Sequence, residues 1–221
     1  FGAQIDDFTS IHIGDINNDS INEILLGIEY GYSSSSVYAF DSNYNIIQTY
    51  KIDGMDIILG IDVADIDLDE QNELVITSGT NVGGSTHPEE WQNYIYIFDS
   101  ETGTLEHKTK QLGKIGSKIG SLNIGNIDND SALEVVALKY GSYSKNGELI
   151  IIDGISKELF LDSRHNYSAV TLGDIDRDSH FEIIAAVDAG KVFIINGQLL
   201  DVLEEYDVGC EKINAIQSID I

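Results

Sequence analysis

Carboxylate and amide side chains gather at alternate positions in short segments of this chain. The segment GDIDRDSHFEIIAAV, residues 173–187, spaces Asp174, Asp176 and Asp178 two residues apart, adds Glu182, and then turns apolar. Carboxylates this close repel one another, and a bound divalent cation removes that repulsion. Calcium takes about six to eight oxygen ligands, so oxygen atoms at alternate loop positions can surround one ion. The pattern therefore favours cation binding.

The same pattern occurs four times, as GDINNDSINEILLG from Gly14, ADIDLDEQNELVIT from Ala64, GNIDNDSALEVVAL from Gly125 and the segment above. We name them loop 1 (residues 15–23), loop 2 (65–73), loop 3 (126–134) and loop 4 (174–182). Positions 1, 3, 5 and 9 offer side-chain oxygens, and position 7 offers a backbone carbonyl. In that order of positions 1, 3, 5, 7 and 9, the predicted metal ligands are Asp15, Asn17, Asp19, Ile21 and Glu23 in loop 1; Asp65, Asp67, Asp69, Gln71 and Glu73 in loop 2; Asn126, Asp128, Asp130, Ala132 and Glu134 in loop 3; and Asp174, Asp176, Asp178, His180 and Glu182 in loop 4.

A second motif follows each loop. It reads SVYAFDS from Ser36, YIYIFDS from Tyr94, ELIIIDG from Glu148 and KVFIING from Lys191. The first loop positions, 15, 65, 126 and 174, are separated by 50, 61 and 48 residues. Two motifs that return in the same order four times indicate four copies of one structural unit.

Each copy has the features of antiparallel strands. Short runs rich in Ile, Val and Tyr are bounded by Gly, Asn, Asp and Ser, and no segment has a sustained helical period with caps. Four strands in a unit of roughly 50 residues are typical of a propeller blade. We therefore predict an all-β fold of four-stranded β-propeller blades over residues 1–221, with repeats at approximately 8–52, 57–112, 119–164 and 168–209.

The D-x-D-x-D-x-x-x-E loop between a short strand and an apolar strand resembles the FG-GAP or VCBS-type repeat, a family that includes the integrin α-subunit head and many bacterial and archaeal surface proteins. The resemblance covers essentially the whole chain. It implies a calcium-binding β-propeller that holds several Ca²⁺ ions, up to one per repeat. The family usually has Gly at position 6, where this chain has Ser20, Glu70, Ser131 and Ser179. The alternative is that Asp and Asn only form side-chain-to-backbone turns, without metal.

The charge balance narrows the range of partners. The chain has 38 acidic and 12 basic residues, and its net charge is −26. Such a surface repels phosphate backbones and anionic membranes, so we expect no nucleic-acid partner. No apolar run approaches the roughly 20 residues of a membrane-spanning helix, so we expect no direct membrane insertion.

Aromatic residues gather in the segments between the second and third strands of the repeats, which also vary in length. Because successive antiparallel strands place alternate loops at opposite ends of a blade, these 2–3 loops lie opposite the acidic loops. Exposed aromatic side chains on variable loops suit a recognition surface, although they could instead cover blade edges. The candidate ligand-binding residues are Tyr30, Tyr32, His87, Trp91, Tyr140 and Tyr143.

The last residues, INAIQSIDI at 213–221, match the first strand of a further repeat. We therefore expect these four repeats to belong to a larger propeller of about six to eight blades, because open edges would expose unpaired strands. We therefore also expect these repeats to pack against further blades or flanking domains.

These features together favour a calcium-stabilised binding module of a cell-surface or secreted protein. A periplasmic location is the alternative. The 2–3 loops of the module would recognise a protein or carbohydrate ligand. No local catalytic motif is present, which favours a non-enzymatic role. The alternatives are the propeller of a polysaccharide-active enzyme of the lyase kind, to which the resemblance also extends, and a structural scaffold in a larger assembly.

Overall fold

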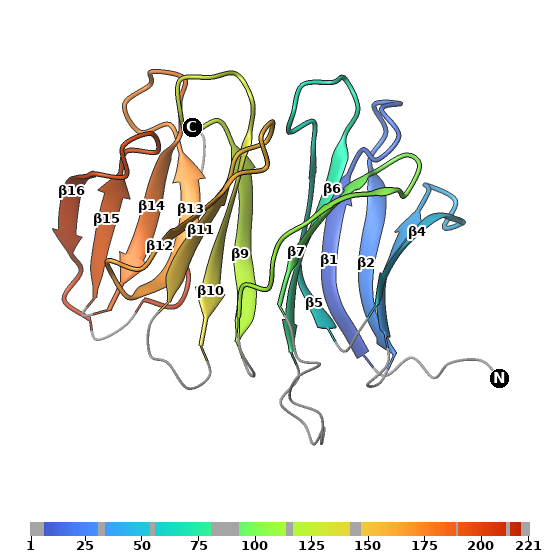
Figure 1. Ribbon diagram of the computed structural model, residues 1–221, viewed down its shortest axis with the longest axis horizontal. Coiled ribbons are helices and arrows are strands. Elements are labelled where there is room, and N and C mark those ends of the chain that lie inside the picture. Colours follow the sequence, from blue (N-terminus) through green and yellow to red (C-terminus); the bar gives the residue numbers. More distant parts are fainter. Residues whose placement is uncertain are drawn as a thin grey trace. The chain divides into compact units, whose positions relative to one another are not determined.

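The computed structural model describes residues 7–30, 34–53, 56–80, 93–113, 117–141, 147–188, 190–210 and 213–217. Within these ranges every helix or strand assigned is a β-strand (Figure 1), which confirms the all-β prediction. The described part of the chain contains no helix long and apolar enough to cross a membrane.

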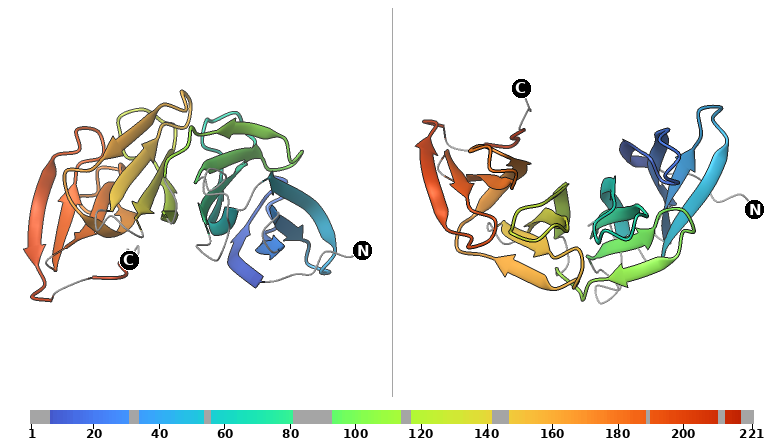
Figure 2. Two further views of the ribbon diagram at one scale, coloured as in Figure 1. Left: turned by 60° about the horizontal axis from the view of Figure 1, so that its bottom comes forward. Right: turned by 90° about the horizontal axis from the view of Figure 1, so that it is seen from above.

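The strands follow one another as antiparallel meanders. The first sheet has the order β1-β2-β3-β4, and the last has the order β13-β14-β15-β16, whose strands lie side by side in chain order in Figure 2. Between them, β5 to β8 and β9 to β12 repeat the arrangement, and the residue pair Gly79–Lys118 links β6 to β9. The strands are β1 (Asp7–Gly14), β2 (Glu23–Tyr30), β3 (Ser34–Phe40), β4 (Ile46–Asp53), β5 (Asp56–Ala64), β6 (Glu73–Thr80), β7 (Ile95–Asp99), β8 (Leu105–Lys108), β9 (Lys118–Gly125), β10 (Glu134–Tyr140), β11 (Glu148–Ile152), β12 (Leu159–Asp162), β13 (Tyr167–Gly173), β14 (Glu182–Val187), β15 (Lys191–Ile195) and β16 (Val202–Asp207).

The chain forms two compact units. The first contains β1 to β8, and the second contains β10 to β16 together with the loop residues Ile66–Leu68; the boundary falls within β9, after Gly120. Each unit has its own apolar core. Leu25, Tyr50 and Leu74 are fully buried in the first, and Val136, Leu149 and Ile183 are fully buried in the second.

The second and third strands of each sheet carry most of these core residues. Strand β10, for example, begins with five buried residues, and β11 has four. Apart from Glu134 at the start of β10, these buried residues are apolar, and continuous apolar runs are typical of strands covered on both faces. Strand β16, at the end of the last sheet, is exposed along its whole length, and three of its six residues (VLEEYD) are acidic.

The first strands differ from one another in burial. In β1, Ile11 and Ile13 are 68% and 61% exposed, whereas every residue of β13 is buried. A period of two identifies the residues that share one face of a strand. It does not tell whether another sheet covers that face.

Candidate metal centre

Each acidic loop joins the first strand of a four-stranded repeat to the second and is organised by its own side chains. In all four loops the carboxylate at position 5 accepts a hydrogen bond of 2.8 Å from the backbone N–H of position 7. This is the side-chain-to-backbone turn that Asp favours. The pairs are Asp19–Ile21, Asp69–Gln71, Asp130–Ala132 and Asp178–His180.

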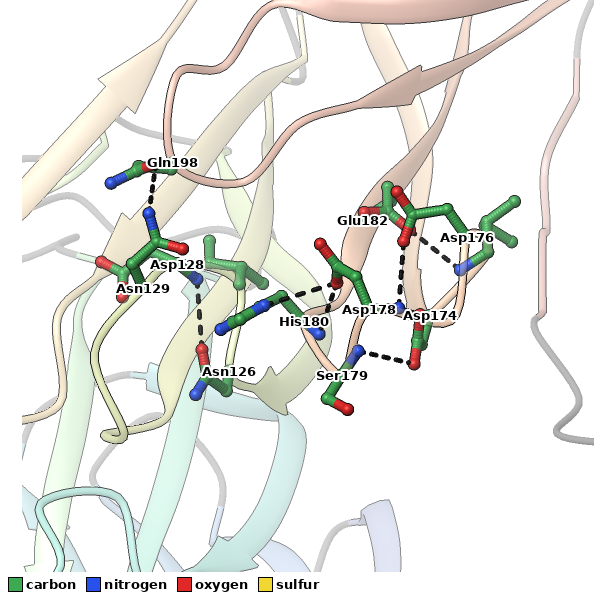
Figure 3. Close-up of polar contacts among 12 residues, drawn as sticks. Asn126, Asp128, Asn129, Asp174, Asp176, Asp178, Ser179, His180, Glu182 and Gln198 are labelled. Carbon is green, nitrogen blue, oxygen red and sulfur yellow. Dashed lines mark hydrogen bonds and ion pairs between the residues drawn. The ribbon is translucent and has the colours of Figure 1, made fainter.

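The carboxylate at position 1 closes the loop in three of the four copies. In loop 4, Oδ1 and Oδ2 of Asp174 accept hydrogen bonds of 3.1 Å from the N–H groups of Asp178 and Ser179 (Figure 3). Asp15 and Asp65 accept the equivalent bonds in loops 1 and 2. These contacts hold the loop in a tight turn that brings positions 1 and 3 toward position 9.

The glutamate at position 9 is the first residue of the second strand and is buried in every copy. In loops 1, 3 and 4 the Oε2 atom of this glutamate accepts a hydrogen bond from the N–H of position 2. The distances are 3.1 Å from Ile16 to Glu23, 2.9 Å from Ile127 to Glu134 and 2.8 Å from Ile175 to Glu182. One carboxylate oxygen of each of these three glutamates therefore fixes the start of its loop.

The missing glycine at position 6 has a visible consequence. Ser20, Glu70 and Ser179 have positive φ angles of 65°, 72° and 76°. Position 4 is also left-handed in these loops, at Asn18, Leu68 and Arg177. Such a conformation costs a non-glycine residue roughly 1 kcal/mol, and the loops adopt it nonetheless.

Loop 3 turns by a different route. Neither Asn129 nor Ser131 has a positive φ. The reason lies at position 1, where Asn126 replaces aspartate and its Nδ2 donates a hydrogen bond of 2.7 Å to the carbonyl of Asp130. An amide that donates into its own loop cannot close it as the carboxylates of Asp15, Asp65 and Asp174 do.

The structure brings three groups of carboxylates together, and in each group one oxygen per residue lies within 4.8 Å of the others. Positions 1, 3 and 9 form the groups in loops 2 and 4. In loop 3, positions 3 and 9 are joined by an aspartate from the turn that follows β11. The groups are Asp65, Asp67 and Glu73; Asp174, Asp176 and Glu182; and Asp128, Glu134 and Asp153.

Asp153 was missing from the predicted ligands. The sequence did contain a signal for Asp153, because this residue is the next-to-last of the second motif and recurs as Asp41, Asp99 and Asn196 in the other repeats. Among the described residues, the position-5 aspartates do not belong to the three groups. Loop 1 has the amide of Asn17 at position 3, and so does not offer three carboxylates at positions 1, 3 and 9.

Two oxygens of these groups are buried and have no hydrogen-bond partner: Oδ1 of Asp67 and Oε1 of Glu134. A buried carboxylate oxygen without a partner is costly unless a cation or donor reaches it. All the side-chain atoms that these groups offer to a metal are carboxylate oxygens, the ligand type that Ca²⁺ prefers. The residues present therefore fit a calcium ion. Near Asp67 a cation is already supplied by the chain, since Lys157 Nζ lies 3.3 Å from its Oδ2.

Burial and like charge shift the ionisation of the position-9 glutamates. Burial raises the pKa of Glu134 to about 7, and the nearby Asp128, Asp130 and Asp153 add to the rise. Burial also raises the pKa values of Glu23 and Glu182, each of which has carboxylate neighbours in its own loop. A bound cation would stabilise the charged forms of all three.

The predicted recognition residues are only partly described. Tyr30 is half-buried and shares a hydrogen bond with Tyr38, and Tyr140 is half-buried and shares one of 2.7 Å with Ser121. Both therefore have contacts within their own sheets. The remaining candidates, Tyr32, His87, Trp91 and Tyr143, lie outside the described residues.

Comparison with solved structures shows a β-propeller fold. The chain is similar to the Dos1 propeller (TM-score 0.63, 14% identity), covering 95% of this chain and 50% of that one. It is similar to the computationally designed Ika8 protein (TM-score 0.55, 11% identity, 97% of this chain and 53% of that one). A further match is BBS1N, solved in complex with ARL6DN (TM-score 0.55, 12% identity, 95% of this chain and 60% of that one).

The chain thus spans about half the length of the first two of these structures and 60% of the third, and it is a partial β-propeller. No protein-family model matches the sequence. No curated protein sequence matches it either.

Proposed function

We propose that this chain is a calcium-stabilised segment of a β-propeller that serves as a binding module of a cell-surface or secreted protein. One observation carries the calcium assignment. Glu134 is 2% exposed, its Oε1 atom has no partner, and carboxylate oxygens of Asp128 and Asp153 lie within 4.8 Å of a Glu134 oxygen. A site of this kind is expensive to form without a cation.

The ligand chemistry favours calcium over other metals. The three groups contain only carboxylates, without His or Cys, which disfavours zinc. Calcium tolerates irregular sets of oxygen ligands, whereas magnesium requires a near-octahedral one. The millimolar calcium found outside cells would occupy even weak loops, and this supports a surface or secreted location.

The binding role rests on the arrangement of the connections. In each repeat the acidic loop lies between the first and second strands, so the second strand ends, and the third begins, at the opposite end of the blade. Ions at one end would stiffen the scaffold while the 2–3 loops, at the other end, engage a protein or glycan.

Calcium titration with calorimetry and thermal melting tests this proposal. We expect calcium binding and a melting temperature about 5 to 10 °C higher in 2 mM Ca²⁺ than in EDTA, because binding to the folded state at 100 Kd adds roughly 2.7 kcal/mol. Glu134→Gln and Glu182→Gln should each remove one ion. Glu101→Gln, at an exposed turn outside the acidic loops, is the matched control. Melting that is identical in calcium and EDTA, with no heat of binding, would contradict the proposal.

A further inference from the structure

A cavity of about 660 Å³ adjoins the carboxylate group of loop 3 and lies wholly within the second unit. Asp128, Glu134 and Asp153 line it together with the residues of β12 and of the turn between β15 and β16. Its volume is in the range of small-molecule sites. Asn129, which follows Asp128, donates a hydrogen bond of 2.8 Å to Gln198, another residue of the lining (Figure 3).

A cation on this group would retain open coordination positions. Each of the three carboxylates uses one oxygen to hold its own turn: Glu134 accepts from Ile127, Asp128 from Asp130, and Asp153 from Ser156. The second oxygen of each of these three carboxylates remains available to the ion, so the side chains supply three ligands. Calcium requires about six to eight. The remaining positions must be filled by backbone carbonyls, by water or by a molecule in the cavity.

The lining of the cavity combines acidic and apolar surfaces. Glu158 adds a fourth carboxylate, and Phe160 and Leu199 line the cavity with exposures of 50% and 68%. The guanidinium of Arg164 is already engaged, because it forms two hydrogen bonds to Asp162, at 3.0 and 2.9 Å. An anionic ligand would therefore meet a surplus of negative charge even with one divalent cation bound.

We propose that this cavity binds a neutral, hydroxyl-rich molecule such as a hexose or a short oligosaccharide. Two neighbouring hydroxyl groups coordinate the divalent cation held by Asp128, Glu134 and Asp153, and the apolar face of the sugar ring packs against Phe160. Carboxylates and an aromatic ring meet both needs of such a ligand, since its hydroxyls are polar and its ring faces are apolar. This inference rests on the proposed calcium binding, and it adds a ligand site at the acidic-loop end of the blades.

The test is calorimetry and saturation-transfer NMR with the full chain and a panel of neutral hexoses and their oligomers, with galacturonate and glucosamine as charged probes. We expect at least one neutral sugar to bind in 2 mM Ca²⁺ and to bind at least tenfold more weakly in EDTA. Phe160→Ala should lower sugar affinity at least tenfold with an unchanged number of bound calcium ions. Asp153→Asn should remove one ion and the sugar. Phe8→Ala, which truncates another exposed aromatic residue, on β1, should change neither.

The outcomes separate this inference from the proposed function. Calcium binding without any neutral sugar overturns the cavity assignment and keeps the calcium module. Binding of the charged probes alone overturns the ligand class, and equal sugar affinity in EDTA overturns coordination by the ion. Sugar binding that neither variant changes overturns the location. If no calcium binds, the proposed function itself fails.

Discussion

The two oxygens of the Glu134 carboxylate have different environments. Oε2 accepts a hydrogen bond of 2.9 Å from the backbone N–H of Ile127, whereas Oε1 is buried and has no partner. The first contact fixes the side chain, and the second oxygen is presented to the group formed with Asp128 and Asp153. A metal ligand that is held in place before the ion arrives loses little conformational entropy on binding.

The raised pKa of Glu134 predicts how stability depends on pH. Its pKa rises from 4.5 to about 7 in the metal-free fold, so the folded state favours the protonated acid. The stability that the folded state gains from protonated Glu134 is fully present below pH 4.5 and is lost as the pH rises to about 7. In EDTA, wild type should therefore lose stability relative to Glu134→Gln across this window, as measured by urea unfolding. In calcium the loss should disappear. A constant difference between the two proteins from pH 4 to 8 would contradict the assigned shift.

Positions 3 and 5 of loop 4 should respond differently to substitution. Asp178 accepts the His180 N–H at 2.8 Å but lies outside the carboxylate group, whereas Asp176 belongs to it. In EDTA, Asp178→Ala should cost about 1 kcal/mol of unfolding free energy through the lost hydrogen bond. Asp176→Asn should be neutral or stabilising, because it reduces repulsion, and should abolish calcium binding at this loop. The reverse pattern would show that position 5, and not position 3, is the ligand.

The left-handed residues at position 6 provide a matched pair of substitutions. Glu70 has a φ of 72°, whereas Ser131, at the same position of loop 3, does not have a positive φ. Glu70→Gly should stabilise the fold by up to about 1 kcal/mol in urea unfolding. It leaves intact the backbone carbonyl that Asn18 contacts. Ser131→Gly should destabilise by roughly 0.5 kcal/mol, because it only adds freedom to the unfolded chain. Equal effects at both sites would contradict the strain argument.

Asp162 is a buried charge of the second unit and has two side-chain partners. It is 2% exposed, pairs with Arg164 through both oxygens and accepts a hydrogen bond of 2.8 Å from Tyr167. Burial alone would raise the pKa of Asp162, but these hydrogen bonds lower it below its ordinary value. The resulting stability is present above about pH 4 and is lost as the pH falls through the lowered pKa.

Asp162→Asn should therefore cost about 1 to 2 kcal/mol in urea unfolding at pH 7, because it weakens the hydrogen bonds that Arg164 and Tyr167 donate to this buried side chain. The difference from wild type should narrow below pH 4. Glu101→Gln removes the same charge at an exposed turn and should change stability by less than about 0.5 kcal/mol. A cost at Asp162 that stays constant down to pH 3 would rule out the charged pair as its source.

The fold could be predicted from the sequence because its signals are local and repeated. Short β-branched runs, turn residues and two motifs in fixed order specify four-stranded meanders without knowledge of distant contacts. The exposure of Ile11 and Ile13 could not be predicted in the same way. Whether a strand face is covered depends on packing between sheets, and a single repeat contains no information about its neighbour.

The grouping of carboxylates was predictable where one loop forms the group alone. Positions 1, 3 and 9 of loop 4 do meet, as the spacing of Asp174, Asp176 and Glu182 indicated. Position 5 served the turn, and spacing could not distinguish this role because both roles require an oxygen at alternate positions. Asp153 lies 19 residues after Glu134, on another hairpin, so only the pairing of β10 with β11 brings it to loop 3.

The position-9 glutamates have one more consequence, because each is also the first residue of a strand that carries core side chains. An ion bound at Glu134 would anchor the start of β10, whose first five residues are all buried. We infer that withdrawal of calcium would accelerate amide hydrogen exchange deep within that strand as well as at the surface turn. The lifetime of the folded molecule would then follow the calcium content of its surroundings.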